Sequence, residues 1–177
     1  MKSCLTLVVD TSSSMKGPKI GAANDAAVNI IQIFQDCASK LGLEAEISVI
    51  TFSDSSVDGL NSEAESFAWN DVRADGLTSF GEVCLHLKKS LEERSSPDLK
   101  ETLVMISDGA ATDDYTDSLC RLLSSPAFHR CLHLSVAIHK FSDPEVLEYF
   151  SGDSTLVFTP ETIEKMEDLF YKFNQQS

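Results

Sequence analysis

The chain has 177 residues, a length that suits one domain, and we expect residues 1–177 to form it. Acidic residues outnumber basic ones by 28 to 14, which gives a net charge of −14 at pH 7. Such a charge repels phosphate backbones and anionic membranes, so it argues against nucleic-acid and membrane-surface roles. It favours cations or a basic partner, or it merely keeps the protein soluble.

Five cysteines stand at irregular spacing, and none belongs to a Cys-x-x-Cys pair: Cys4, Cys37, Cys84, Cys120 and Cys131. This usage is typical of reduced thiols in a cytosolic protein. The first apolar run, Leu5 to Val9, is too short for a signal-peptide core, and no stretch is long enough to cross a membrane. We therefore expect a cytoplasmic protein.

The first half of the chain predicts a strand, a helix and a hairpin in turn. Leu5 to Val9 is a buried strand, and a Ser/Thr-rich loop leads to Pro18, which suits a first helical position. Apolar residues then recur at helical spacing until Gly42, which can end the helix. The elements that follow are a strand over Ala45–Phe52, a polar turn at Ser53–Gly59, an edge strand near Ser66–Trp69 with Phe67 and Trp69 in its core, and a helix with Phe80, Cys84, Leu87 and Leu91 on one face.

The second half alternates strands and helices. A buried strand, Leu103 to Ile106, ends in Ser107-Asp108-Gly109, and Asp113 or Asp114 can cap a helix that runs through Leu123. The remaining elements are a strand over Cys131–Ile138, a helix from Ser142–Glu145 to Gly152, a strand over Thr155–Phe158 and a terminal helix from Thr159-Pro160 packed through Ile163, Met166, Phe170 and Phe173.

Buried strands that alternate with helices predict parallel βαβ units, and the helix-free connection between the second and third strands predicts an antiparallel edge. The predicted fold is therefore α/β and Rossmann-like: a mainly parallel six-stranded sheet with one antiparallel edge strand and helices on both faces. Asp10 and Asp108 each follow a buried strand, at the edge where such sheets bind ligands. Their side chains converge only if those two strands are neighbours.

Three motifs resemble one family. Asp10-Thr11-Ser12-Ser13-Ser14 looks like the Asp-x-Ser-x-Ser opening motif of von Willebrand factor A (VWA) domains. Gly76-Leu77-Thr78 resembles the threonine loop of that family, and Ser107-Asp108-Gly109 resembles its second aspartate motif. The three stand in the family's order, each on the expected element, and the resemblance runs from about Leu5 to Phe173.

Within the family, the chain is most similar to stand-alone bacterial proteins of the tellurium-resistance (TerY-like) type. They share a stretch like Ile47–Phe52 and the run Asp108-Gly109-x-x-Thr112-Asp113-Asp114. Two positions depart from the family pattern, Ser13 for glycine and Ala111 for proline, and neither supplies a ligand in that pattern. Relatives of this type are associated with stress-response systems that contain a protein kinase and a protein phosphatase, so the resemblance implies such partners.

The resemblance also implies a metal-ion-dependent adhesion site (MIDAS). Ser12, Ser14 and Thr78 would ligate the ion through their hydroxyls, with Asp10 and Asp108 binding directly or through water. Mg²⁺ prefers about six hard oxygens and keeps some waters, and these side chains supply such oxygens; Mn²⁺ and Ca²⁺ are the alternatives. In the family, a Glu or Asp of another protein completes the shell.

Other interpretations of these residues remain open. The loop from Asp10 could be a turn and capping cluster. An enzyme would use Asp10 as a phosphorylated nucleophile, but haloacid-dehalogenase-type phosphatases need a carboxylate where Ser12 stands, and response-regulator receivers need an acidic pair near the first strand. His129, Cys131 and His133 alternate and would allow a zinc site on one strand face, without an evident fourth ligand. We expect a binding module that recognises a partner carboxylate, and not an enzyme.

Overall fold

A computed structural model describes residues 1–53, 56–76, 79–111, 113–139 and 144–176. Within these ranges the strands form one sheet in the order β3-β2-β1-β4-β5-β6. β1 pairs in parallel with β2 and with β4, β4 with β5 and β5 with β6, whereas β3 runs antiparallel to β2. The predicted fold class is confirmed. The strands are β1 (Lys2–Asp10), β2 (Glu44–Ser53), β3 (Ser56–Glu63), β4 (Leu99–Ser107), β5 (Leu132–Ala137) and β6 (Val157–Phe158).

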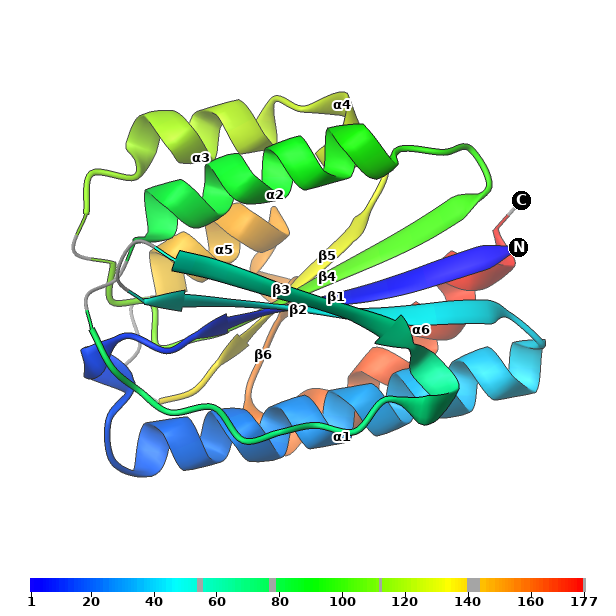
Figure 1. Cartoon of the computed structure of the whole chain (residues 1–177), viewed down its shortest axis with the longest axis horizontal. Helices are drawn as coiled ribbons and strands as arrows, with labels where there is room; N and C mark the ends of the chain where they lie inside the picture. Colours follow the sequence, from blue (N-terminus) through cyan, green and yellow to red (C-terminus); the bar gives the residue numbers. More distant parts are fainter. Residues whose placement is uncertain (54–55, 77–78, 112, 140–143, 177) are drawn as a thin grey trace.

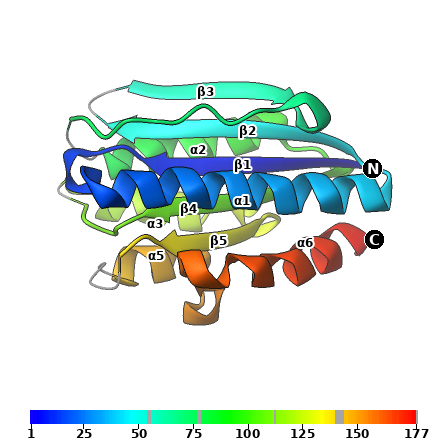
Figure 2. The same cartoon turned by 90° about the horizontal axis from the view of Figure 1, so that it is seen from below.

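Helices cover both faces of the sheet (Figures 1 and 2). One face carries α1 (Pro18–Leu41) and α6 (Met166–Gln175). The other face carries α2 (Phe80–Arg94), α3 (Thr116–Leu123), α4 (Pro126–His129) and α5 (Pro144–Ser151). Short 3₁₀ helices lie at Ser13–Met15, Ala64–Ser66, Ser154–Leu156 and Pro160–Lys165.

β1 is a central strand, and its side chains are buried on both faces. Leu5, Leu7 and Val9 pack in the core beneath α1, whereas Val8 packs in the core beneath α2. Successive side chains of a strand point to opposite faces, so a strand covered on both sides reads as a continuous apolar run. Each large apolar side chain buried in this way stabilises the fold by about 1.5–3 kcal/mol.

The predicted first helix is confirmed at both ends. α1 begins at Pro18 and ends at Leu41, and Gly42 adopts a left-handed backbone with φ +62°. The amide of Gly42 donates to the carbonyls of Ala38 and Ser39, which closes the last turn.

The antiparallel edge strand lies earlier than the sequence predicts. β3 occupies Ser56–Glu63, the first half of which falls in the predicted polar turn, and pairs with β2 along Glu46–Ser53. Ser66–Trp69, where the edge strand is predicted, contains no strand, because Ser66 ends a 3₁₀ helix and the next three residues are irregular. Backbone pairing along β2 outweighs the weak strand propensity of the β3 residues.

Phe67 and Trp69 therefore pack differently from the prediction. Both are partly buried against the core beneath α1, from an irregular segment that runs along that helix (Figure 2). Asn24 of α1 fixes this segment, because its Oδ1 accepts hydrogen bonds from Trp69 Nε1 at 3.1 Å and from the Val72 amide at 2.9 Å.

Asp113 caps a different helix from the predicted one. Its carboxylate accepts hydrogen bonds from the amides of Phe80 (3.2 Å) and Gly81 (2.7 Å) at the start of α2. α3 instead begins after Tyr115, without a side-chain cap. The orphan amides of a helix N-terminus can be satisfied from anywhere in the chain, and sequence proximity does not reveal such a cap.

The zinc hypothesis for His129, Cys131 and His133 is wrong. His129 ends α4 and Cys131 precedes β5, so the three side chains do not share a strand face. His133 stacks on the ring of Phe128, 4.4 Å between centroids, and its Nδ1 lies 3.0 Å from the carbonyl oxygen of Ser151. The described residues contain no group of three or more His, Cys, Asp or Glu side chains placed to hold a metal.

Both elements at the end of the chain differ from the prediction. β6 is only Val157–Phe158, and the helix after Thr159 starts as a 3₁₀ segment before α6. Among the described helices, we find none whose length and hydropathy would let it span a membrane.

Candidate metal site

The order of the strands brings Asp10 and Asp108 to one edge of the sheet. β1 and β4 are neighbours in register, from Lys2 opposite Leu99 to Val9 opposite Ile106. Asp10 is the last residue of β1, and Asp108 directly follows β4. The strand order reverses between β1 and β4, which is where sheets of this kind bind ligands. The strands that precede Asp10 and Asp108 are therefore neighbours, as the convergence of these side chains requires, and their carboxyl ends lie at the left in Figure 1.

The loop after β1 curls so that two hydroxyls face the same point. The amide of Ser12 donates to Oδ1 of Asp10 at 2.9 Å, and a 3₁₀ turn begins at the next residue. The Oγ atoms of Ser12 and Ser14 lie 3.0 Å apart, and Ser14 Oγ donates to Oδ1 of Asp108 at 3.3 Å. Four of the five predicted ligands thus come together: Asp10, Ser12, Ser14 and Asp108.

Neighbouring backbone holds this loop in place. The Thr11 amide donates to the carbonyl of Phe52, and the Thr11 carbonyl accepts from the Asp75 amide at 2.7 Å. The amide of Ser13 donates to the Gly76 carbonyl at 2.8 Å, and the φ of +83° at Gly76 suits a glycine. The fifth predicted ligand, Thr78, lies outside the described residues.

A serine at the end of β4 fixes the carboxylate of Asp10. Ser107 Oγ donates to its Oδ2 at 2.7 Å and accepts from the Gly109 amide at 2.9 Å. Phe52 and Phe80 line a small pocket of about 10 Å³ together with Asp10 and Ser107. The carboxylate therefore sits between an apolar floor and the polar loop above it.

The two carboxylates are nearly buried, at 1% exposure for Asp10 and 3% for Asp108. Burial raises the pKa of Asp10, and the charge of Asp108 adds to that rise, although hydrogen bonds from Ser107 and Ser12 oppose it. Burial also raises the pKa of Asp108. The hydrogen bond from Lys19, the amide of Ala110 and the charge of Lys19 outweigh burial, so the pKa of Asp108 lies below its ordinary value. Asp108 is therefore an ionised acceptor at neutral pH.

The sequence analysis gave no role in the site to Lys19 or to Ser107. Lys19 places its Nζ 2.9 Å from Oδ2 of Asp108, and Ser107 bridges the ends of β1 and β4. The sequence does contain a sign that Lys19 has a partner elsewhere in the fold, because a lysine in the first turn of a helix is unfavourable against the helix dipole. Ser107 directly precedes Asp108 but alternates to the other side of the strand, so its contact with Asp10 required the register.

The oxygen donors fit a small divalent ion. An octahedral Mg²⁺ with bonds of about 2.0–2.1 Å places neighbouring ligand oxygens about 2.9 Å apart. The spacings here are 3.0 Å between Ser12 Oγ and Ser14 Oγ and 3.3 Å between Ser14 Oγ and Asp108 Oδ1. These are also hydrogen-bond distances, so the arrangement allows a metal shell without requiring one.

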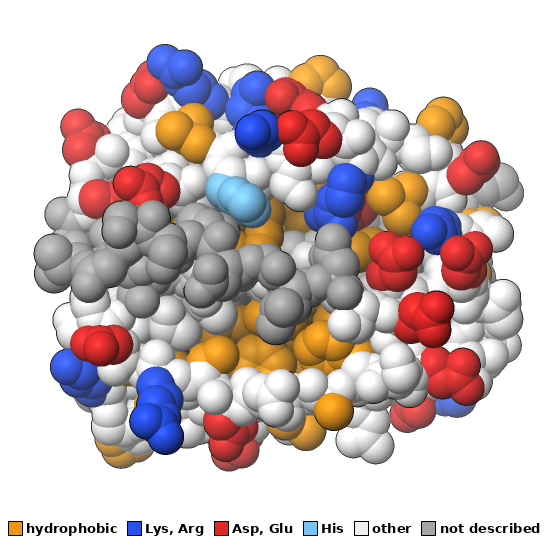
Figure 3. All heavy atoms as spheres, in the orientation of Figure 1, with side chains coloured by type: hydrophobic (Ala, Val, Ile, Leu, Met, Phe, Trp, Pro, Cys, Tyr) orange, Lys and Arg blue, Asp and Glu red, His pale blue; other side chains and the backbone are white. Residues whose placement is uncertain are grey.

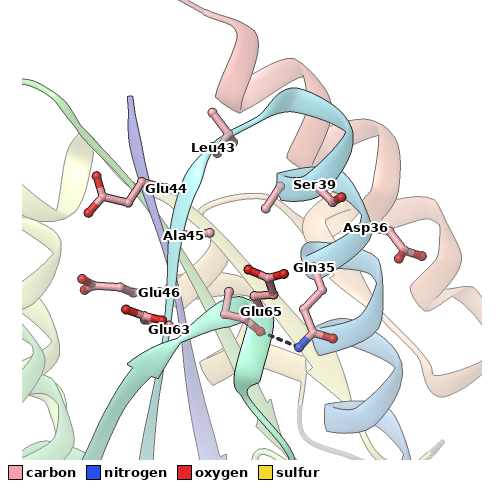
Figure 4. Close-up of a pocket in the computed structure, with 11 residues that line it drawn as sticks. Gln35, Asp36, Ser39, Leu43, Glu44, Ala45, Glu46, Glu63 and Glu65 are labelled. Carbon is pink, nitrogen blue, oxygen red and sulfur yellow. Dashed lines mark hydrogen bonds between the residues drawn. The ribbon is translucent and has the colours of Figure 1, made fainter.

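A second acidic region lies at the opposite end of the strands. A groove of about 500 Å³ is lined by Glu44 and Glu46 of β2, Glu63 of β3, Glu65 of the following turn and Asp36 of α1 (Figure 4). Carboxylates also gather at this end of the face in Figure 3. Glu44 pairs with Lys2 in the sheet register and Phe52 with Asp10, a separation of roughly 26 Å along the strands. The groove is therefore no part of the candidate metal site.

Neither a family model nor a curated protein matches the chain by sequence. Solved structures do match by fold. The pilus adhesin SpaC from Lactobacillus rhamnosus GG has a TM-score of 0.67 at 13% identity over 96% of this chain. Proximal thread matrix protein 1 (PTMP1) of the mussel byssus, in a structure with a zinc-occupied MIDAS motif, has 0.62 at 14% over 97%. The SpRpn10 VWA domain has 0.58 at 14% over 99%.

These comparisons establish the fold. The chain spans 29% of the adhesin, 45% of the mussel protein and 95% of the SpRpn10 domain. At such low identity the likeness concerns the arrangement of strands and helices alone. The chain has the Rossmann-like VWA fold.

Proposed function

We propose that residues 1–177 form a single metal-dependent protein-binding module. Asp10, Ser12, Ser14, Thr78 and Asp108 would hold a divalent ion, with Mg²⁺ as the first candidate and Mn²⁺ and Ca²⁺ as alternatives. The observation that carries the proposal is the approach of Ser14 Oγ to Asp108 Oδ1 at 3.3 Å, which joins the oxygen donors of two separate loops at one edge of the sheet.

Two fold neighbours support this proposal. The mussel protein has been crystallised with a zinc-occupied MIDAS motif, and SpaC is a pilus adhesin. A divalent ion and a protein partner are thus compatible with this fold. The more specific role, in a tellurium-resistance-type stress response with kinase and phosphatase partners, rests on the sequence motifs alone.

The ion would supply an electrophilic centre for an incoming oxygen. Serine hydroxyls are neutral and offset little of a divalent charge, while the two carboxylates are held by hydrogen bonds within the protein. A carboxylate of a partner can complete the shell. Because the chain carries a net charge of −14, a partner with a single Glu or Asp on an otherwise neutral or basic surface is favoured.

Catalysis through Asp10 is disfavoured by its surroundings. Its carboxylate is 1% exposed, Oδ1 accepts from the Ser12 amide and Oδ2 accepts from Ser107. A nucleophilic carboxylate needs a path to its substrate and a neighbouring acid or base. Position 12, where a phosphatase of the haloacid-dehalogenase type needs its carboxylate, holds a serine. We infer binding and not phosphoryl transfer.

Calorimetric titration with MgCl₂ and MnCl₂ tests the metal, using wild type, Asp10→Ala and Ser14→Ala. Glu65→Gln, in the distant groove, is the matched control because it removes one carboxylate without touching the site. We expect binding to wild type and Glu65→Gln and none to Asp10→Ala. Affinity capture in Mg²⁺ and again in EDTA then tests the partner. Equal metal binding by Asp10→Ala, or capture of the same protein in EDTA, would contradict the proposal.

A further inference from the structure

Lys19 forms an ion pair inside the candidate site. Its Nζ lies 2.9 Å from Oδ2 of Asp108, whose side chain is 2% exposed, while the lysine side chain is 30% exposed. The pair joins the first turn of α1 to the loop after β4. Part of the lysine side chain is therefore exposed to solvent, while its ammonium group lies against a buried carboxylate.

The position of Lys19 is unfavourable for a helix. It follows Pro18 at the start of α1, and that first turn contains no acidic residue. The positive end of the helix dipole disfavours a cation there. The electrostatic compensation comes from across the fold, where Asp108 and Asp10 place two carboxylates close together. Lys19 thus serves as the counter-ion of the site.

Three of the four carboxylate oxygens of Asp10 and Asp108 accept hydrogen bonds from backbone amides or from a buried serine. The Ser12 amide and Ser107 Oγ donate to the two oxygens of Asp10. The Ala110 amide donates to Oδ1 of Asp108 at 3.0 Å. Oδ2 of Asp108 instead receives its hydrogen bond from the end of a flexible four-carbon stem. This oxygen can exchange its partner by rotation of one side chain, without a change in the backbone.

We propose that Lys19 is an internal cation that competes with the divalent ion for Asp108 and thereby sets the metal affinity of the site. This inference rests on the proposed metal-binding function. The ion would bind the carboxylate of Asp108 through Oδ1, beside Ser14 Oγ, while the ammonium group holds Oδ2 of the same carboxylate. The two cations repel each other at this separation, so loading drives the lysine out into solvent. The apparent dissociation constant then rises by the inverse of the fraction of molecules in which Lys19 has already left.

Such competition has a consequence for regulation. Without a bound ion, the lysine neutralises part of the buried charge and joins the start of α1 to the loop after β4. The site would then load only when the ion, alone or together with a partner carboxylate, outcompetes the lysine. Metal and partner would bind cooperatively, because each stabilises the arrangement with Lys19 displaced.

The test compares Mg²⁺ affinities by calorimetry. Lys19→Gln removes the charge but keeps an amide that can donate to Asp108, so the carboxylate is not left without a donor. Lys19→Arg keeps the charge. Lys16→Gln is the matched control, since Lys16 is an exposed lysine three residues earlier in the same segment. We expect Lys19→Gln to bind Mg²⁺ about tenfold more tightly than wild type, with Lys19→Arg and Lys16→Gln close to wild type.

The ammonium resonance of Lys19 gives an independent readout on the unaltered protein. In EDTA we expect a protected NH₃⁺ signal, assigned by its loss in Lys19→Arg, and its disappearance at saturating Mg²⁺. Equal or weaker Mg²⁺ binding by Lys19→Gln, or an NH₃⁺ signal that persists at saturation, would overturn the inference while leaving the metal site intact. Failure of every variant, wild type included, to bind Mg²⁺ would overturn the proposed function as well.

Discussion

The hydroxyl of Ser107 donates to Oδ2 of Asp10 at 2.7 Å, so the last residue of β4 holds the last residue of β1. The same hydroxyl accepts from the Gly109 amide, which ties the following loop to the pair. One buried side chain therefore fixes the orientation of a carboxylate and the start of the loop that carries Asp108.

Ser107→Ala should weaken both the fold and the site. It leaves one oxygen of a buried carboxylate and one buried amide without this partner, which costs about 1–3 kcal/mol. Urea unfolding measures the stability, and Mg²⁺ titration measures the affinity, which should also fall. Ser66→Ala is the control, because Ser66 is exposed and bonds only its local backbone. A Ser107→Ala protein as stable as that control would show that water replaces the serine without loss.

Mg²⁺ should stabilise the protein through the site. For a dissociation constant near ~1 mM, about 10 mM Mg²⁺ adds about 1.4 kcal/mol by linkage. At 177 residues this corresponds to a rise in melting temperature of roughly 3–5 °C. Differential scanning fluorimetry should show the rise for wild type and Glu65→Gln and its absence for Asp10→Ala. A full response from Asp10→Ala would place the ion elsewhere on the acidic surface.

The ion pair between Arg94 and Glu101 should be far more important than an exposed pair. Arg94 Nη2 lies 2.5 Å from Glu101 Oε1, and the glutamate is 7% exposed. Arg94→Met leaves that buried charge unpaired and should cost about 3 kcal/mol at pH 7. Arg121→Met is the matched control, since its pair with Asp117 is exposed and should contribute less than about 1 kcal/mol.

The cost of Arg94→Met should depend on pH. Burial already raises the pKa of Glu101 above its ordinary value of 4.5, and loss of Arg94 raises it further. A carboxyl whose pKa is raised by folding favours the folded state when protonated, so the deficit should be largest at neutral pH and shrink as the pH falls toward 4.5. Chemical denaturation at several pH values measures this slope. A deficit independent of pH would assign the effect to lost packing of the arginine stem.

Cys120 should be the reactive thiol of the folded protein. All five cysteines are free, and Cys120 is the exposed one. Burial raises the pKa to about 11 for Cys4 and Cys37 and to about 12 for Cys84 and Cys131, so these thiols are scarcely ionised at neutral pH. A thiol reagent such as DTNB should modify one cysteine rapidly. Rapid modification of a second cysteine, or unchanged rapid modification of a Cys120→Ser variant, would contradict this prediction. We also expect all five thiols to be reduced in protein purified without oxidant, and partner binding to survive Cys131→Ser.

The sequence was sufficient for the features that depend on short-range pattern. Apolar runs located β1 and β4, and the Pro18 and Gly42 signals located the ends of α1. The fold class followed from the alternation of elements, and it implied that Asp10 and Asp108 could meet. What it could not supply were contacts that depend on register and on side chains from distant elements, as with Ser107 on Asp10 and Lys19 on Asp108.

Most of the errors have the same physical origin, a contact with a distant part of the chain. β3 is a strand because it pairs with β2, and its own composition favours a turn. Trp69 and Phe67 have strand-forming side chains but are held against α1 by Asn24 and the core. His129 falls into α4, which breaks the apparent alternation with His133. For β3 and for the Phe67–Trp69 segment a tertiary contact overrides a local preference, whereas His129 lies in a short helix that the alternation did not reveal.

The cap on α2 comes from Asp113, which follows the candidate ligand Asp108 closely in the sequence. Asp108 and Asp113 are five residues apart, one at the edge of the candidate site and the other bound to the first amides of α2. A partner that binds at Asp108 would thus act on the same stretch of sequence that supplies the cap of α2, so we expect the start of that helix to respond to occupancy of the site.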